Sequence, residues 1–157
     1  MQDARLVCPI QTTGDFSYHN RRFVGPRLLR AGDAAGFMDP IFSAGVYLAM
    51  YSGKLAAQAV TESLHHGDAG ARRFLAYERR VHDAMEFYWQ MVEGFYTTPF
   101  MELFLEPRHK FQLPWAVNAV LAGELEGGWA MRWRVRLFFL LVKLQARWPL
   151  VPRISFD

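Results

Sequence analysis

The sequence predicts a mainly α-helical protein with a few short β-strands near its N-terminus. Two observations carry this prediction. Beyond about residue 43, apolar side chains recur three and four residues apart, which is the spacing of one face of a helix. Before that point, short apolar stretches alternate with polar turns such as Gly25-Pro26. The chain has 157 residues, 52% of them hydrophobic, and can therefore bury a core.

The expected strands come first and the expected helices follow. One or two short strands are predicted before residue 25, and a further strand over residues 27–31. Apolar periodicity predicts helices over about residues 43–64, 69–95, 114–122 and 129–148.

Specific residues mark the expected helix ends. Ser43 is the predicted N-cap of the first helix, and Gly67 is its predicted C-terminal stop. Pro99 is expected to break the chain after the second helix, so that residues 100–105 add only a short helical turn. A loop is predicted over residues 123–128.

Composition narrows the function classes. The net charge is only +3, and no recognition motif or dense basic patch accompanies it, so no nucleic-acid partner is expected. The single Cys8 cannot form an internal disulfide and fits a cytoplasmic setting. The longest apolar run, residues 137–142, is far shorter than the ~18 residues of a membrane span. The five histidines lack metal-ligand spacing, and no metal site is expected.

The last helix is predicted to be amphipathic and basic. Its large apolar residues recur on one side: Trp133, Leu137, Leu140, Leu144 and Trp148. Its cations lie elsewhere: Arg132, Arg136, Lys143 and Arg147. The pattern is typical of a core-packed helix with a solvated basic face, and it leaves open binding to a membrane surface, a carrier protein or a partner helix.

The most informative segment begins with a strand that leads into a small-residue turn. Asp33 directly follows the predicted strand, where its carboxylate can accept hydrogen bonds from ligand hydroxyl groups. Gly32 and Ala34 have little or no side chain, so a ligand can approach the backbone closely. A tight structural turn capped by Asp33 is an equally good interpretation from the residues alone.

The same segment ends in a predicted helix start. Asp39-Pro40 favours an extended or turn conformation, and Ser43-Ala44-Gly45-Val46 then opens the helix. The unpaired N–H groups and positive dipole end of a helix start suit an anion or a ring carbonyl.

At these residues the sequence resembles a known family. The second flavin-binding motif of the FAD-dependent monooxygenase superfamily is similar to residues 32–49, which read Gly-Asp-Ala-Ala-Gly-Phe-Met-Asp-Pro-Ile-Phe-Ser-Ala-Gly-Val-Tyr-Leu-Ala. The Asp-Pro-Ile-Phe-Ser-Ala-Gly part resembles the flavin-dependent, tryptophan halogenase-like enzymes. The resemblance covers residues 16–153.

The resemblance implies a fold and a division of the chain. The fold would be the helical C-terminal portion of an α/β FAD-binding fold of the Rossmann-like, p-hydroxybenzoate hydroxylase (PHBH) type. Residues 1–46 would hold the terminal strands and the second FAD-binding motif, and residues 47–157 the helical C-terminal region.

The resemblance also implies the site residues. The cofactor-binding set is Gly32, Asp33, Ala34, Pro40, Ala44, Gly45 and Val46. Within it, Asp33 would bind the ribityl or pyrophosphate part of FAD, and the helix start would meet the pyrimidine edge of the flavin. A chloride or bromide would lie near the backbone of Ser43, Ala44 and Gly45. No catalytic residue is assigned.

Three features of the resembled family have no counterpart here: its Gly-x-Gly-x-x-Gly loop, its Trp-x-Trp-x-Ile-Pro signature and its catalytic Lys. We therefore expect a C-terminal fragment or subunit that is inactive alone. Its expected partners are the missing N-terminal FAD-binding half, a flavin reductase and an aromatic or carrier-bound substrate. The alternatives are a piece of a non-halogenating FAD-dependent monooxygenase or reductase, and a helical interaction module without catalysis.

Overall fold

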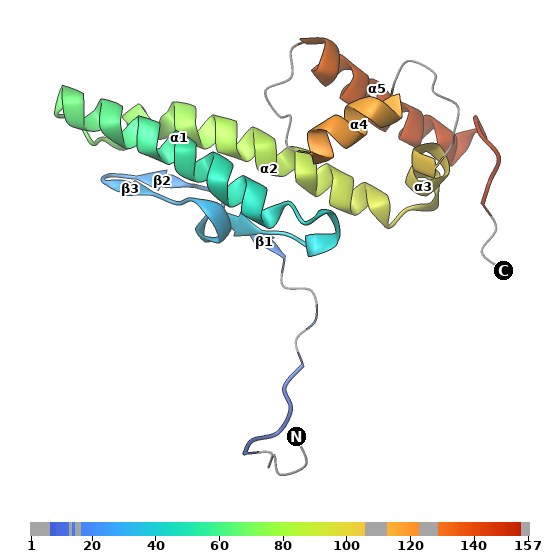
Figure 1. Cartoon of the computed structure of the whole chain (residues 1–157), viewed down its shortest axis with the longest axis horizontal. Helices are drawn as coiled ribbons and strands as arrows, with labels where there is room; N and C mark the ends of the chain where they lie inside the picture. Colours follow the sequence, from blue (N-terminus) through green and yellow to red (C-terminus); the bar gives the residue numbers. More distant parts are fainter. Residues whose placement is uncertain (1–6, 13, 15–16, 106–112, 123–128, 155–157) are drawn as a thin grey trace.

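The structure is a computed structural model that describes residues 7–12, 14, 17–105, 113–122 and 129–154. Over these residues the protein is mostly helical with a few short strands, as the sequence predicts. The helices are α1 (Gly45–His66), α2 (Leu75–Phe95), α3 (Thr98–Leu105), α4 (Leu113–Leu121) and α5 (Trp129–Arg147). Figure 1 shows α1 and α2 side by side above the strands, while α3, α4 and α5 gather near the C-terminal end of α2.

The strands form two antiparallel pairs of two residues each. The pair β2 (Val24–Gly25) and β3 (Leu28–Leu29) is a tight hairpin. Arg27 closes its turn with a left-handed φ of 58°, so the strand predicted over residues 27–31 is confirmed only at its centre. The second pair joins β1 (Tyr18–His19) to β4 (Gly36–Phe37), with Tyr18 opposite Phe37 and His19 opposite Gly36. The turn at Gly32 therefore connects β3, which belongs to the first pair, with β4, which belongs to the second.

The predicted N-cap of the first helix is wrong. Pro40, Ile41 and Phe42 form a 3₁₀ turn, η2 (Pro40–Phe42), which closes when the N–H of Ser43 donates to the carbonyl of Pro40 at 2.8 Å. This turn holds Ser43 at a left-handed φ of 51°, and Ala44 becomes the residue that precedes the helix. The prediction for the other end is confirmed, because Gly67 stops α1 with a φ of 64°.

The break predicted at Pro99 is also wrong. Helix α3 begins at Thr98, so Pro99 lies in its first turn, where its missing N–H costs no hydrogen bond. The interruption instead lies at Tyr96 and Thr97. The bounds of α4 and α5 agree with the prediction within one or two residues. Helix α2 ends at the predicted residue but begins later than predicted, because a 3₁₀ turn, η3 (Ala71–Phe74), precedes it. The loop predicted over residues 123–128 lies outside the described residues.

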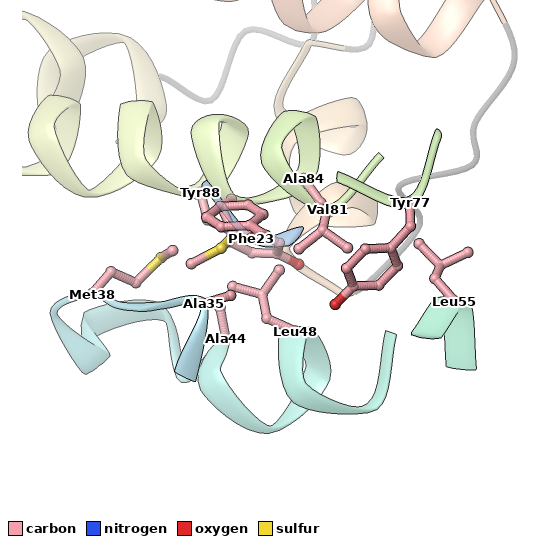
Figure 2. Packing of buried hydrophobic residues seen from close by; sticks show 11 residues of the cluster. Phe23, Ala35, Met38, Ala44, Leu48, Leu55, Tyr77, Val81, Ala84 and Tyr88 are labelled. Carbon is pink, nitrogen blue, oxygen red and sulfur yellow. The ribbon is translucent and has the colours of Figure 1, made fainter. Parts of the chain in front are cut away.

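The main core lies between α1, α2 and the strand segment (Figure 2). Leu48 and Leu55 of α1 face Tyr77, Val81 and Tyr88 of α2, and all five are buried. These α2 residues recur four and seven positions apart, which is the apolar spacing that predicts a helix over residues 69–95. Phe23, Ala35, Met38 and Ala44 join the cluster from the segment before α1, so the segment that carries the candidate site is anchored in this core.

Two anchors of the strand segment are polar. The hydroxyl of Tyr77 donates to the carbonyl of Arg30 at 2.5 Å, and the N–H of Phe23 donates to the Glu78 carboxylate at 2.6 Å. Each of these two hydrogen bonds joins α2 to a residue more than 40 positions earlier in the chain. The β2–β3 hairpin is therefore fixed to α2 by specific bonds as well as by apolar contact.

Helix α5 buries a different side from the one its large apolar residues suggest. Met131, Val135 and Phe138 are buried, whereas Trp133 and Trp148 are exposed. Both sets recur at helical spacing, and only contact with α3 and α4 decides which of them packs. No helix among the described residues combines the length and apolarity that crossing a membrane requires.

A buried polar cluster fastens the end of the chain. The side chain of Gln145, on α5, is only 1% exposed. Its amide nitrogen donates to the Glu102 carboxylate at 2.6 Å and to the carbonyl of Val151 at 3.1 Å. Its amide oxygen accepts from the N–H groups of Leu150 and Val151, and Glu102 also accepts from the N–H of Ile154. The segment after α5 is thus bonded to α3 and α5.

Two core tyrosines predict a loss of stability at alkaline pH. Burial raises the pKa of Tyr77 from 10.0 to about 12, and burial together with the nearby Tyr47 raises the pKa of Tyr88 to about 12. Below about pH 10 both side chains stay protonated in the folded and unfolded states, so the stability is intact. Above it the unfolded state ionises first, and each tyrosine should lower the stability by about 1 kcal/mol at about pH 11.

Urea unfolding at about pH 8 and about pH 11 measures this loss. We expect the loss between the two pH values to be smaller in Tyr88→Phe than in the unmodified chain, by about half of the loss that Tyr77 and Tyr88 together cause. An equal alkaline loss in Tyr88→Phe and in the unmodified chain would contradict the prediction.

Candidate functional site

The turn predicted to bind the cofactor is a 3₁₀ turn, η1 (Gly32–Ala34). Tyr18 of β1 and Asn20, which directly follows β1, bond to its backbone. The hydroxyl of Tyr18 donates to the carbonyl of Asp33 at 2.7 Å. The side-chain amide of Asn20 donates to the carbonyls of Ala34 and Ala35 at 2.9 and 3.0 Å. These bonds satisfy backbone acceptors of the turn and fix its path.

Helix α1 also contacts this turn. The N–H of Gly32 donates to the hydroxyl of Ser52 at 2.9 Å, and that buried hydroxyl donates back to the carbonyl of Leu48 at 2.6 Å. Gly32 has a left-handed φ of 55°, and a Cβ there would lie 3.2 Å from the Cβ of Ala49. The glycine is therefore required both by its backbone conformation and by the close approach of α1.

The side chains of the turn divide between core and surface. Ala35 is fully buried, whereas Asp33 and Ala34 are exposed. The Asp33 carboxylate forms no hydrogen bond or ion pair with any residue that the structure describes, and only its backbone carbonyl is engaged. Asp33 is thus not the side-chain cap of a structural turn, and its carboxylate is available to accept hydrogen bonds from a ligand.

The start of α1 is equally open. Ala44 precedes the helix and offers no side-chain cap, and Gly45 has open space where a Cβ would stand. Val46 is 74% exposed. The first N–H groups of the helix, at Gly45 and Val46, receive no side-chain acceptor from the described part of the chain. They form a donor site with a positive dipole end.

The approach to this helix start is fixed by the C-terminal end of α2. The Asp39 carboxylate accepts from the N–H of Ile41 at 2.9 Å and from the hydroxyl of Tyr96 at 3.1 Å. The rings of Phe42 and Phe95 meet edge to face with their centroids 5.3 Å apart. Pro40 lies exposed between these anchors. The turn before α1 is therefore held against the C-terminal end of α2 by both polar and aromatic contacts.

The structure joins the two predicted halves of the site through α1. The Gly32 turn packs on α1 at Ala49 and Ser52, one to two helical turns beyond Gly45. Sequence reasoning named residues that are mostly exposed, with Ala44 buried in the core, but missed Tyr18, Asn20 and Ser52, which hold the turn in place. These polar residues precede or follow the turn by 14 to 20 positions, and no local pattern signals such contacts.

Sequence reasoning also missed a cleft of about 720 Å³ between α2 and α5. Its floor is apolar and includes Phe87, Val135 and Phe139, while its rim carries charged side chains from both helices. None of the residues predicted to bind the cofactor or halide lines this cleft. The cleft is therefore separate from the predicted cofactor and halide residues.

Known proteins resemble parts of this chain. No family profile matches it. Over 72% of its length it is 28% identical to a 1H-pyrrole-2-carbonyl-(peptidyl-carrier protein) chlorinase of Pseudomonas fluorescens, of which it covers 26%. It is 40% identical over 40% of its length to a flavin-dependent halogenase of Armillaria mellea and covers 12% of that protein. A digeranylgeranylglycerophospholipid reductase of Methanosphaerula palustris is 42% identical over 36% of the chain, which covers 14% of it. The chain thus spans about a quarter or less of the length of these relatives.

Proposed function

We propose, on the premise that this chain is related to the flavin-dependent halogenases over part of its length, that it supplies the flavin-ring and halide side of an FAD-dependent halogenase site. The observation that carries the proposal is the pairing of an unengaged carboxylate at Asp33 with an uncapped helix start at Gly45 on one supporting helix. The fold then belongs, in our proposal, to the helical C-terminal portion of a Rossmann-like FAD-binding fold.

The residues present fit the cofactor. The exposed Asp33 carboxylate can accept hydrogen bonds from the ribityl hydroxyl groups, and the absence of bulk at Gly32 and Ala34 lets the chain of the cofactor approach the backbone. The N–H groups of Gly45 and Val46 can donate to the carbonyl edge of the flavin ring. When bound and reduced, FAD supplies the electrons that activate dioxygen for oxidation of a halide.

The proposed halide position uses the same helix start. A chloride or bromide would lie beside the backbone of Ser43, Ala44 and Gly45, where the positive end of the α1 dipole favours an anion. The left-handed Ser43 is exposed, while the Ala44 side chain turns into the core. The backbone, rather than a side chain, would therefore meet the halide.

The proposal includes partners that the chain requires. Residues 1–46 would carry the motif and residues 47–157 the helical region, with an N-terminal FAD-binding half supplying the phosphate site. A flavin reductase would supply reduced flavin, and the substrate would be aromatic or carrier-bound. The resemblance to a chlorinase that acts on a carrier-bound pyrrole supports the substrate class. We propose that the chain alone is inactive.

Asp33→Ala tests the cofactor role. In the protein completed by an N-terminal FAD-binding half, we expect it to weaken FAD binding about 10- to 100-fold, because a charge-assisted hydrogen bond contributes about 1.5–3 kcal/mol. Flavin fluorescence titration measures the affinity. Glu62→Ala, at an exposed carboxylate of α1, is the matched control and should bind FAD normally.

Two results would count against the proposal. Unchanged FAD affinity and turnover in Asp33→Ala would favour a helical interaction module without catalysis. Tight, stoichiometric FAD binding by the 157-residue chain alone would contradict the proposed need for an N-terminal half.

A second candidate is a non-halogenating FAD-dependent monooxygenase or reductase. The similarity to the lipid reductase of Methanosphaerula palustris favours it, since that protein matches a comparable stretch at comparable identity. The completed enzyme distinguishes the two. A product that contains bromine or chloride-derived chlorine, and that forms only when the halide is present, supports halogenation, whereas flavin-dependent turnover that ignores halide supports the second candidate.

A further inference from the structure

We propose that the cleft between α2 and α5 binds a small organic anion with an apolar body, such as an aromatic or short-chain carboxylate. The cleft volume of about 720 Å³ falls within the range of about 300–1,000 Å³ that small-molecule sites occupy. Its lining includes Tyr51 of α1 and none of the residues assigned to FAD or halide. The proposal thus goes beyond the proposed function and does not depend on it.

The floor of the cleft selects an apolar body. Val135 is buried there, and Phe87 and Phe139 are half-buried, with their ring centroids 6.4 Å apart at an angle of 76°. These rings present faces and edges against which a planar or aliphatic group can pack. A strongly hydrated ligand such as inorganic phosphate or a polyphosphate would gain nothing from this floor.

The α5 wall of the cleft selects an anion. It carries Arg132, Arg136 and Lys143, and the sequence of α5 contains no acidic residue. Within the described ranges none of these three cations forms an ion pair. Their positive potential is therefore not neutralised by neighbouring side chains and is focused beside a low-dielectric floor.

The α2 wall fixes the orientation and the charge of the ligand. It contributes Arg80 and the exposed carboxylates Asp83 and Glu86, together with Gln90, whose amide donates to Glu86 at 3.2 Å. With two carboxylates and one cation, this wall disfavours an anionic group relative to the α5 wall, which carries three cations and no carboxylate. A ligand with one anionic group at one end satisfies both walls, whereas an anion with charge at both ends would meet Asp83 and Glu86.

Two dyes with the same apolar body test the proposal. 8-Anilinonaphthalene-1-sulfonate carries an anionic group, and N-phenyl-1-naphthylamine lacks it. Fluorescence titration of the full chain should show one saturable site for the sulfonate. We expect the neutral dye to bind at least about tenfold more weakly, and sulfonate binding to weaken with added salt.

Matched charge reversals locate the site. Arg136→Glu combined with Lys143→Glu should weaken sulfonate binding at least about tenfold, since each reversal replaces attraction by repulsion at the α5 wall. Arg79→Glu combined with Arg147→Glu changes the net charge equally at exposed positions of α2 and α5 outside the cleft. This control pair should change the affinity less than about threefold.

A further variant and a fold check keep the outcome decisive. Leu140→Glu places a carboxylate at an exposed position of the α5 wall and should also weaken sulfonate binding. Circular dichroism and thermal melting confirm that each variant is folded. The proposal is overturned if the neutral dye binds as tightly as the sulfonate, if both reversal pairs weaken binding equally, or if Leu140→Glu leaves it unchanged. The assay contains no FAD, so its failure leaves the proposed flavin site unaffected.

Discussion

Gln145→Leu is expected to lower the free energy of unfolding by about 3–5 kcal/mol, because removing one partner of a buried, hydrogen-bonded carboxylate is among the most costly substitutions. The variant loses every bond of the Gln145 amide, including the 2.6 Å bond to Glu102 and the bond from Leu150. Glu102 then keeps only the N–H of Ile154 as a partner among the described residues. Urea unfolding measures the loss.

Gln90→Leu is the control for this prediction. Gln90 is exposed on α2 and forms one hydrogen bond, to Glu86, so its replacement should change the stability by about 0.5 kcal/mol or less. Gln145→Leu should also expose the segment after residue 147 to protease, because its bonds to the Gln145 amide are lost. A loss of stability below about 1 kcal/mol would show that water replaces the amide bonds.

The Gln145 cluster marks where sequence reasoning about the fold ends. Apolar spacing predicts α2 and α5 because packing of one face decides whether a helix forms. The same spacing cannot show that Gln145 is buried, because it is polar and its partner Glu102 is 43 positions away. The exposed Trp133 and Trp148 illustrate the converse error, in which apolar residues are grouped as a face that tertiary contacts leave in solvent.

Local rules fail where a short turn overrides them. Ser43 is a favourable N-cap residue by type, but the turn of Pro40 fixes it in the left-handed region, and the helix starts one residue later. Pro99 lies in the first turn of α3 and does not break a helix, since a first-turn proline lacks only an unused donor. In both cases the residue type correctly indicated a nearby helix end, but it did not give the residue at which the helix begins.

At the candidate site, too, the sequence points to some residues and not to others. The resemblance names Asp33 and Gly45, and the structure leaves both exposed and open to a ligand, although their roles stay proposals. The residues that hold the turn, Tyr18, Asn20 and Ser52, carry no local signal because each acts on a backbone group across a large sequence separation. Positioning residues of this kind become visible only in three dimensions.

Gly36→Ala is expected to cost about 1–3 kcal/mol, as overpacking of a tight contact does. A Cβ at Gly36 would lie 2.7 Å from the Met85 Cε, 2.8 Å from the carbonyl oxygen of Tyr18 and 3.0 Å from the His19 Cα. Met85 can move its flexible end, but Tyr18 and His19 present backbone atoms of the paired strand. The pair of β1 and β4 must therefore separate. Urea unfolding measures the cost.

Gly25→Ala is the matched control, because it places the same methyl group in the other two-residue pair at ordinary distances of 3.6 and 3.7 Å from Leu28. It should change the stability by about 0.5 kcal/mol or less. The difference reaches the candidate site, since β1 and Asn20 hold the turn that presents Asp33. Gly36→Ala should therefore weaken FAD binding by the completed protein, whereas Gly25→Ala should not. Equal FAD affinity in the two variants, with Gly36→Ala destabilised, would show that the turn keeps its position without β1.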